Sequence, residues 1–149
     1  MKTVIQRVSH ASVSIDGNVK SSIGKGLLVL LGVGEDDGQE DIDWLVRKIS
    51  AMRIFEDSQG IMNLSVMDIG GDVLVVSQFT LMADCRRGNR PSYIKAARHE
   101  ISVPLYERFC ACMSEVIGKP VGTGEFGAYM KVDLLNDGPV TIVLDSKNR

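Results

Sequence analysis

The sequence predicts an α/β fold in which helices cover one face of mixed sheets, in a single domain over residues 1–149. Three observations lead to this fold class. The run GLLVLLGV at 26–33 is continuously apolar, as in a central strand. Apolar residues recur at helical spacing over 42–52, and the C-terminal segment alternates apolar with polar residues. Strand and helix patterns therefore follow one another along one chain.

The composition narrows the class of protein. With 44% hydrophobic and 24% charged residues, the chain lies in the ordinary globular range. The net charge of −2 lacks the overall footprint of a nucleic-acid binder, so any such contact must be local. Neither a signal peptide nor a membrane span is readable, which predicts a cytoplasmic protein with no membrane contact. Two histidines and three irregularly spaced cysteines predict no metal site.

The first half predicts a hairpin, a central strand and a helix, in that order. Residues 2–25 are rich in β-branched side chains and turn at Asp16-Gly17-Asn18, which indicates an antiparallel hairpin. The apolar run at 26–33 follows it. A helix comes next, with acidic residues at its start and an apolar face formed by Ile42, Leu45, Val46, Ile49 and Met52. A short strand around Arg53 to Phe55 and two glycine turns end this half.

The second half opens with LVVSQFTLMAD at 74–84, predicted as a buried strand that turns polar after Val76 and runs on to the loop at 88–91. A second helix is predicted from Ser102 as N-cap to Gly118. Its first turn contains Pro104, and its apolar face comprises Leu105, Phe109, Met113 and Val116.

The end of the chain predicts a β-hairpin. Residues 130–134 alternate in polarity, Asn136 to Pro139 supply turn residues, and VTIVLD reads as the returning strand. The predicted hairpin tip is therefore Asn136 to Pro139.

Two polar motifs could carry chemistry, SQFTLMA at 77–83 and NDGPVT at 136–141. By residue type alone, the first is a strand end that satisfies local backbone groups and the second is a turn. However, the pair resembles the motifs of the D-aminoacyl-tRNA deacylases, first described as D-tyrosyl-tRNA deacylases. The supporting matches are QRV at 6–8, GLLVLLGV at 26–33, RIFEDSQGIMNLSV at 53–66 and GNRPSY at 88–93. The resemblance covers nearly the whole chain.

The resemblance implies a three-layer β/β/α fold and a homodimer with shared active sites, in which a cis Gly138-Pro139 peptide enters the partner's site. The implied substrate is the acceptor end of a D-aminoacyl-tRNA, whose ester to the 3′-terminal adenosine is hydrolysed without a cofactor. An enzyme that rejects L-amino acids but accepts many D side chains must read the α-carbon, and a rigid backbone wedge can do so. Glycine has no side chain to reject, so its ester should also be hydrolysed.

The resemblance places Ser77, Gln78, Phe79 and Thr80 in the catalytic wall. The amides of Phe79 and Thr80 are candidates for stabilising the oxyanion, with Ser77 and Gln78 orienting the acyl group or water. Thr80 as a covalent nucleophile ranks second, because no base stands at motif spacing. The 2′-hydroxyl of the terminal ribose is a candidate for assisting the reaction. Candidates for substrate binding are Gly138, Pro139, Asn136, Thr141 and Met130, with Phe126 and Tyr129 as either pocket or core residues.

The basic residues have two readings each. Arg7 is either a snorkelling surface residue or a support of the Gly-Pro loop. A cluster of five cations within 13 residues is either a solvated face or a set of tRNA phosphate contacts, and comprises Arg86, Arg87, Arg90, Lys95 and Arg98. Two other functions remain open: a Thr/Ser-dependent hydrolase of small esters using Thr80 or Ser77, and a non-catalytic RNA-binding protein using this cluster.

Overall fold

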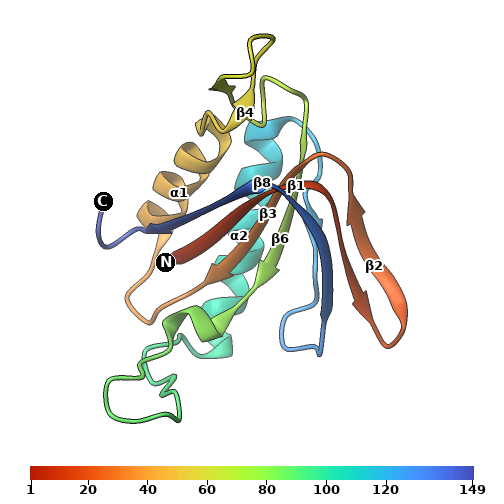
Figure 1. Ribbon diagram of the computed structural model, residues 1–149. Coiled ribbons are helices and arrows are strands. Elements are labelled where there is room, and N and C mark those ends of the chain that lie inside the picture. The colour runs from red at the N-terminus through yellow and green to blue at the C-terminus, as the bar shows by residue number, and fades with distance from the viewer.

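The computed structural model describes residues 1–149 and shows a mixed β-sheet with two long helices (Figure 1), which confirms the predicted α/β class. The elements follow in the order β1 (Lys2–Ile15), β2 (Asn18–Ile23), β3 (Gly26–Gly32), α1 (Gln39–Ala51), β4 (Phe55–Glu56), β5 (Met62–Leu64), β6 (Asp72–Ser77), the 3-10 helix η1 (Phe79–Met82), α2 (His99–Ile117), β7 (Gly122–Thr123) and β8 (Lys131–Asp145). No helix is long and apolar enough to cross a membrane.

Strand β1 organises the main sheet. It pairs antiparallel with β2 and then with β3, so Ala11 lies opposite Ile23 and Val8 opposite Gly26 in one continuing register. The predicted N-terminal hairpin is thus confirmed, and β3 extends its second arm. Its turn has positive φ at Asp16 (50°) and Gly17 (78°), as a tight hairpin turn requires. Beyond β3 the sheet continues with β6 and β7, both added in parallel.

Alternate residues of β3 face two different cores. Leu27, Val29 and Leu31 belong to the larger core, which also contains the buried faces of α1 and α2. Leu28 belongs to a smaller core shared with Leu74 of β6 and with residues of β1 and β2. Burial on both faces explains the continuous apolar run. The result is three layers, β/β/α, with both helices on one side of β3 and β6 (Figure 1).

The predicted C-terminal hairpin is wrong. Strand β8 runs in one direction along β1, with Lys131 opposite Ser14 and Asp145 opposite Lys2. Asn136 pairs with Val8 and Thr141 with Gln6, so residues 137–140 bulge out opposite a single β1 residue. The turn-type residues of the NDGP motif therefore form a wide bulge, because tertiary pairing with β1 keeps both flanks in line.

The predicted strand at 74–84 is too long. Strand β6 ends at Ser77, and the chain then turns into η1, where the Leu81 amide donates to the Gln78 carbonyl (3.2 Å). The neighbouring strand β3 ends at Gly32, so no ladder is available further along. The short strand predicted around Arg53 to Phe55 begins only at Phe55, as β4.

Helix α2 begins at His99, three residues before the predicted N-cap. Ser102 lies inside the helix, where its buried hydroxyl donates to the Arg98 carbonyl (3.0 Å), so the N-cap prediction is wrong. Pro104 likewise lies inside the helix and not in its first turn. The buried face is turned from the predicted one, comprises Tyr106, Phe109, Cys110 and Met113, and leaves Val116 exposed. Gly118 ends the helix as predicted, with φ +76°.

Candidate active site

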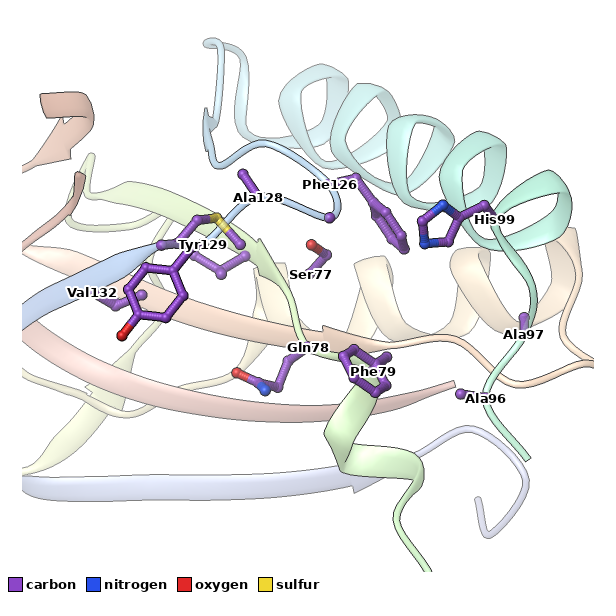
Figure 2. A pocket seen from close by; sticks show the side chains of 13 residues that line it. Ser77, Gln78, Phe79, Ala96, Ala97, His99, Phe126, Ala128, Tyr129 and Val132 are labelled. Atoms are coloured by element: carbon purple, nitrogen blue, oxygen red, sulfur yellow. The ribbon is translucent and has the colours of Figure 1, made fainter. Parts of the chain in front are cut away.

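A cavity of about 500 Å³ opens where β6 ends (Figure 2). One wall is the chain leaving β6, with Ser77, Gln78 and Phe79. The segment that leads into α2 forms a second wall, and the segment before and at the start of β8 forms a third. The remaining lining residues are Val76, Ala96, Ala97, His99, Phe126, Gly127, Ala128, Tyr129, Met130 and Val132. The cavity is therefore mainly apolar. Ser77 and Gln78 supply polar groups at the end of β6, and His99 and Tyr129 supply polar groups on the other two walls.

The β6 wall holds three of the four predicted catalytic residues. The Gln78 amide donates to the Leu31 carbonyl (2.8 Å), which fixes this turn against β3. The Gln78 side-chain amide donates to the Thr80 hydroxyl, and Thr80 itself does not line the cavity. Phe79 and Thr80 begin η1, so that helix cannot satisfy their backbone amides. The Phe79 amide thus has no acceptor within the helix and belongs to a lining residue, and the Thr80 amide follows one residue further along η1.

The opposite wall is built from aromatic rings. The Phe126 ring meets His99 edge to face at 5.2 Å and Tyr106 at 6.0 Å. The Tyr106 hydroxyl donates to the Val75 carbonyl (2.8 Å), and burial raises the pKa of this hydroxyl well above its usual value. The hydroxyl therefore stays protonated and ties α2 to β6. Phe126 is fixed between two neighbours as a cavity wall.

Sequence reasoning missed several cavity residues. His99, Ala96, Ala97, Gly127 and Ala128 belong to segments distant from β6 in sequence, and none is part of either motif. The proximity of Phe126 and Tyr129 to β8 did suggest them, and both line the cavity. The sequence predicts the second helix from Ser102, which leaves His99 in the preceding loop and gives no reason to place it at a site. Its position at the first residue of α2 places it against the cavity.

The bulge of β8 lies outside this cavity. The Gly138–Pro139 peptide is cis, as the resemblance implied, and both residues are exposed. Asn136 closes the neck of the bulge: its side-chain oxygen accepts from the Val140 amide (3.0 Å) and its nitrogen donates to the Thr141 hydroxyl (3.2 Å). Of the residues predicted to bind substrate, Met130 lines the cavity of its own chain, whereas Asn136, Gly138, Pro139 and Thr141 do not.

Arg7 supports this bulge from beneath. It is 6% exposed, so its interpretation as a snorkelling surface residue is wrong. Its Nε donates to the Asp137 carbonyl (2.9 Å), and its Nη1 donates to the Ile54 carbonyl (2.7 Å). The guanidinium thus joins the bulge to the chain after α1. Because the guanidinium is planar, these two bonds fix the direction of the bulge as well as its distance.

All five residues of the predicted basic cluster are exposed, on the segment between η1 and α2. Arg86 is partly neutralised: the Asp84 carboxylate accepts from its Nε (3.0 Å), and this pairing lowers the pKa of Asp84. Lys95 lies 4.0 Å from the same carboxylate. Arg87, Arg90 and Arg98 take part in none of the ion pairs of the structure and remain available to anions.

No three His, Cys, Asp or Glu residues gather where they could hold a metal ion. All three cysteines are free thiols. Cys110 is buried, and this burial raises its pKa to about 11, which keeps it a protonated packing residue.

Comparison with known proteins gives one consistent family. The family model described as D-Tyr-tRNA(Tyr) deacylase matches residues 4–145. The chain is 65% identical to a D-aminoacyl-tRNA deacylase of Bacteroides thetaiotaomicron and 59% identical to one of Flavobacterium psychrophilum. Each comparison covers 100% of this chain and 99% of the relative.

Two solved structures share the fold. One is titled c-Myc DNA Unwinding Element Binding Protein, with a TM-score of 0.93 and 42% identity over 97% of this chain and 98% of that one. The other is a probable eukaryotic D-amino acid tRNA deacylase, with a TM-score of 0.82 over 96% and 97% of the two chains; at 16% identity it shows the fold alone. From the family model and these full-length relatives, the chain belongs to the D-Tyr-tRNA(Tyr) deacylase family.

Proposed function

We propose that this protein hydrolyses the ester that joins a D-amino acid to the 3′-terminal adenosine of tRNA, and that it also accepts glycine esters. The observation that carries the activity is the family match over residues 4–145, together with full-length relatives named for the same reaction. The cavity at the end of β6 is the site for the acyl group and the adenosine. Its apolar walls suit the base and varied side chains, and its polar end suits the ester.

We further propose that the enzyme is a cytoplasmic homodimer with shared active sites. The support is that Gly138 and Pro139 are exposed and held in a fixed direction by Arg7, yet they do not line the cavity of their own chain. The cavity of a second copy is a place where such a peptide can act. There it would fill the space that an L side chain requires, while its carbonyls accept hydrogen bonds from the substrate's α-amino group.

The chemistry proposed for the site is oxyanion stabilisation. The amides of Phe79 and Thr80 can donate to the carbonyl oxygen as it gains charge, an interaction worth about 2.7–4 kcal/mol per donor. Ser77 and Gln78 orient the acyl group or the attacking water. The 2′-hydroxyl next to the ester assists, so replacing it with hydrogen would slow turnover. The cations that follow η1 bind phosphates of the acceptor end, with little base specificity.

Two alternatives each have one supporting observation. A Thr/Ser-dependent hydrolase of small esters is supported by His99, a candidate base, because it lines the same cavity as Ser77. No hydrogen bond joins His99 to Ser77 or Thr80. A non-catalytic nucleic-acid binder gains from the relative titled as a DNA unwinding element binding protein. Covalent trapping of an acyl-enzyme would favour the first. RNA binding without ester loss would favour the second.

The deciding experiment compares ester loss from D-tyrosyl-, L-tyrosyl- and glycyl-tRNA. Wild type should release the D and glycine esters and spare the L ester. Pro139→Ala should slow D-ester loss by about 100-fold, because misplacing a positioning group by about 1 Å has an effect of that order. Pro120→Ala, another exposed proline, is the matched control and should behave as wild type. Equal loss of all three esters would contradict chiral selection, and no loss of any would exclude the activity.

A further inference from the structure

An exposed aromatic pair stands beside the cavity. It consists of Phe79, whose backbone amide belongs to the proposed catalytic wall, and Tyr93, which the proposed function does not use. The rings of Phe79 and Tyr93 meet edge to face, with centroids 5.0 Å apart and planes at 71°. Phe79 is 52% exposed and Tyr93 is 38% exposed. Phe79 also lines the cavity, whereas Tyr93 does not. The pair therefore leads from the cavity out to the surface, and an edge-to-face contact leaves ring faces free for a third planar group.

The backbone holds Tyr93 in place. Asp84 and Ser92 exchange both of their backbone hydrogen bonds (2.8 and 2.9 Å), which closes the loop between them just before Tyr93. On the other side, the Tyr93 carbonyl accepts from the Ala96 amide (2.9 Å). These bonds fix the backbone on both sides of Tyr93, and the edge-to-face contact with Phe79 positions its ring. Pre-organised rings lose little conformational freedom when a ligand stacks on them.

The charges around the pair favour an anionic ligand. The segment 84–98 contains five cations and a single carboxylate, Asp84. Asp84 is engaged by Arg86, which leaves Arg87 and Arg90 in the same loop without an ion pair. In Figure 1 this segment projects from the end of the molecule at which β6 stops. Aromatic faces among exposed arginines are the combination that binds single-stranded nucleic acid, with bases stacked and phosphates paired.

We infer that Phe79 and Tyr93 form a stacking platform for the unpaired nucleotides that immediately precede the 3′-terminal adenosine of tRNA. The inference rests on the proposed function, which puts that adenosine in the cavity. An RNA strand that leaves the cavity past Phe79 would reach Tyr93 next and then the arginines of the 84–92 loop. The platform tolerates any base, because every base has a π face. Its role is binding and positioning, so it acts on KM for tRNA.

The test compares two substrates, D-tyrosyl-tRNA and 3′-O-D-tyrosyl-adenosine, which lacks all preceding nucleotides. Tyr93→Leu keeps the apolar bulk and removes the ring, so it should lower the ratio of kcat/KM on tRNA to kcat/KM on the adenosine ester about 10-fold, mainly through KM for tRNA. Tyr93→Phe keeps the ring and should retain the wild-type ratio. Tyr93→Ala repeats the measurement without the bulk of leucine.

Three results would overturn the platform. An unchanged ratio in Tyr93→Leu would mean that no nucleotide stacks there, whereas an equal fall on both substrates would make Tyr93 part of the reaction cavity or of the fold. An altered oligomeric state in sedimentation would make the pair a subunit contact. Failure of the proposed function itself is distinguishable, because wild type would then release neither D ester.

Discussion

At the scale of single residues, Arg7 shows how one buried side chain can set the direction of a surface feature. Its guanidinium donates to the Asp137 and Ile54 carbonyls and lies 3.7 Å from the Asp137 carboxylate. A buried cation is tolerated only when its donors are satisfied and an opposite charge is near. The bulge supplies Arg7 with one carbonyl acceptor and the opposite charge, both from Asp137, while Ile54 supplies the other acceptor, so the bulge and the arginine stabilise each other.

We predict that Arg7→Met lowers both stability and activity. Two carbonyls lose a charged donor, and the free energy of unfolding should fall by roughly 1.5–3 kcal/mol, as measured by urea denaturation. Deacylation of D-tyrosyl-tRNA should fall further than the loss of folded protein explains, because the bulge loses its fixed direction. Lys25→Met is the control: Lys25 lines the same small cleft as Arg7 and Asp137 and makes no hydrogen bond to the bulge. Identical effects of the two variants would contradict this role.

At the scale of elements, β8 contains two parts that the sequence alone does not distinguish: the flanks that pair with β1 and the central bulge. Its flanks pair with β1 along nearly its whole length, which fixes the sheet edge. Its central residues 137–140 leave the ladder and present the cis peptide to the outside. Bulges of this kind are typical of sites where a sheet must direct a side chain or a peptide toward function. The same strand thus combines a paired sheet edge with an exposed bulge, which the proposed function assigns to substrate selection.

We predict that two damaged subunits complement each other. Gln78→Ala alters the cavity wall and Pro139→Ala alters the bulge, so each pure dimer should be nearly inactive. After mixed refolding, a dimer of one Gln78→Ala and one Pro139→Ala chain has one intact cross-subunit site, and activity should return to roughly a quarter of wild type for random C2 assembly. The measurement is D-tyrosyl-tRNA deacylation by the mixture and by each variant alone. No recovery would mean that each bulge serves its own cavity.

At the scale of the whole molecule, a buried polar cluster joins the end of β8 to helix α1. The Asp41 carboxylate accepts from the Ser146 hydroxyl (2.6 Å) and from Lys147 Nζ (3.0 Å). Burial alone would raise the pKa of Asp41, but these bonds and the Gly38 amide outweigh it and lower the pKa to about 2. Residues more than 100 positions apart are thus tied at a site that is 3% exposed.

We predict an acid-sensitive stability from this cluster. Because the folded-state pKa of Asp41 lies below its ordinary value of 3.8, its contribution is complete above about pH 4 and is lost as the pH falls toward 2. The contribution at neutral pH is about 2 kcal/mol. Urea unfolding between pH 2 and pH 7 should show Asp41→Asn losing this dependence and Ser146→Ala losing part of it. Equal pH dependence in wild type and Asp41→Asn would contradict the assignment.

Local patterns predicted those elements whose physics is local. The helical face from Ile42 to Ile49, the turn at Asp16-Gly17 and the helix end at Gly118 are present as predicted, whereas Met52 lies just beyond the helix as its extended C-cap. The first motif also lies at the end of β6 beside the cavity, and the second contains the cis peptide that the family resemblance implies. Errors arose where a partner decides the outcome: β6 stops where β3 stops, and β8 continues straight where its residues favour a turn.

The sequence by itself determined the fold class, the family and the two motifs, because apolar periodicity and motif identity are properties of neighbouring residues. Only the tertiary structure decided that Arg7 is buried beneath the bulge, that His99 and Phe126 close the cavity, and that Tyr93 meets Phe79. Each of these contacts joins segments that are separate in sequence. They form because burying the two faces of β3 and β6 brings β1, β8 and α2 together, and no local pattern records which side chains then meet.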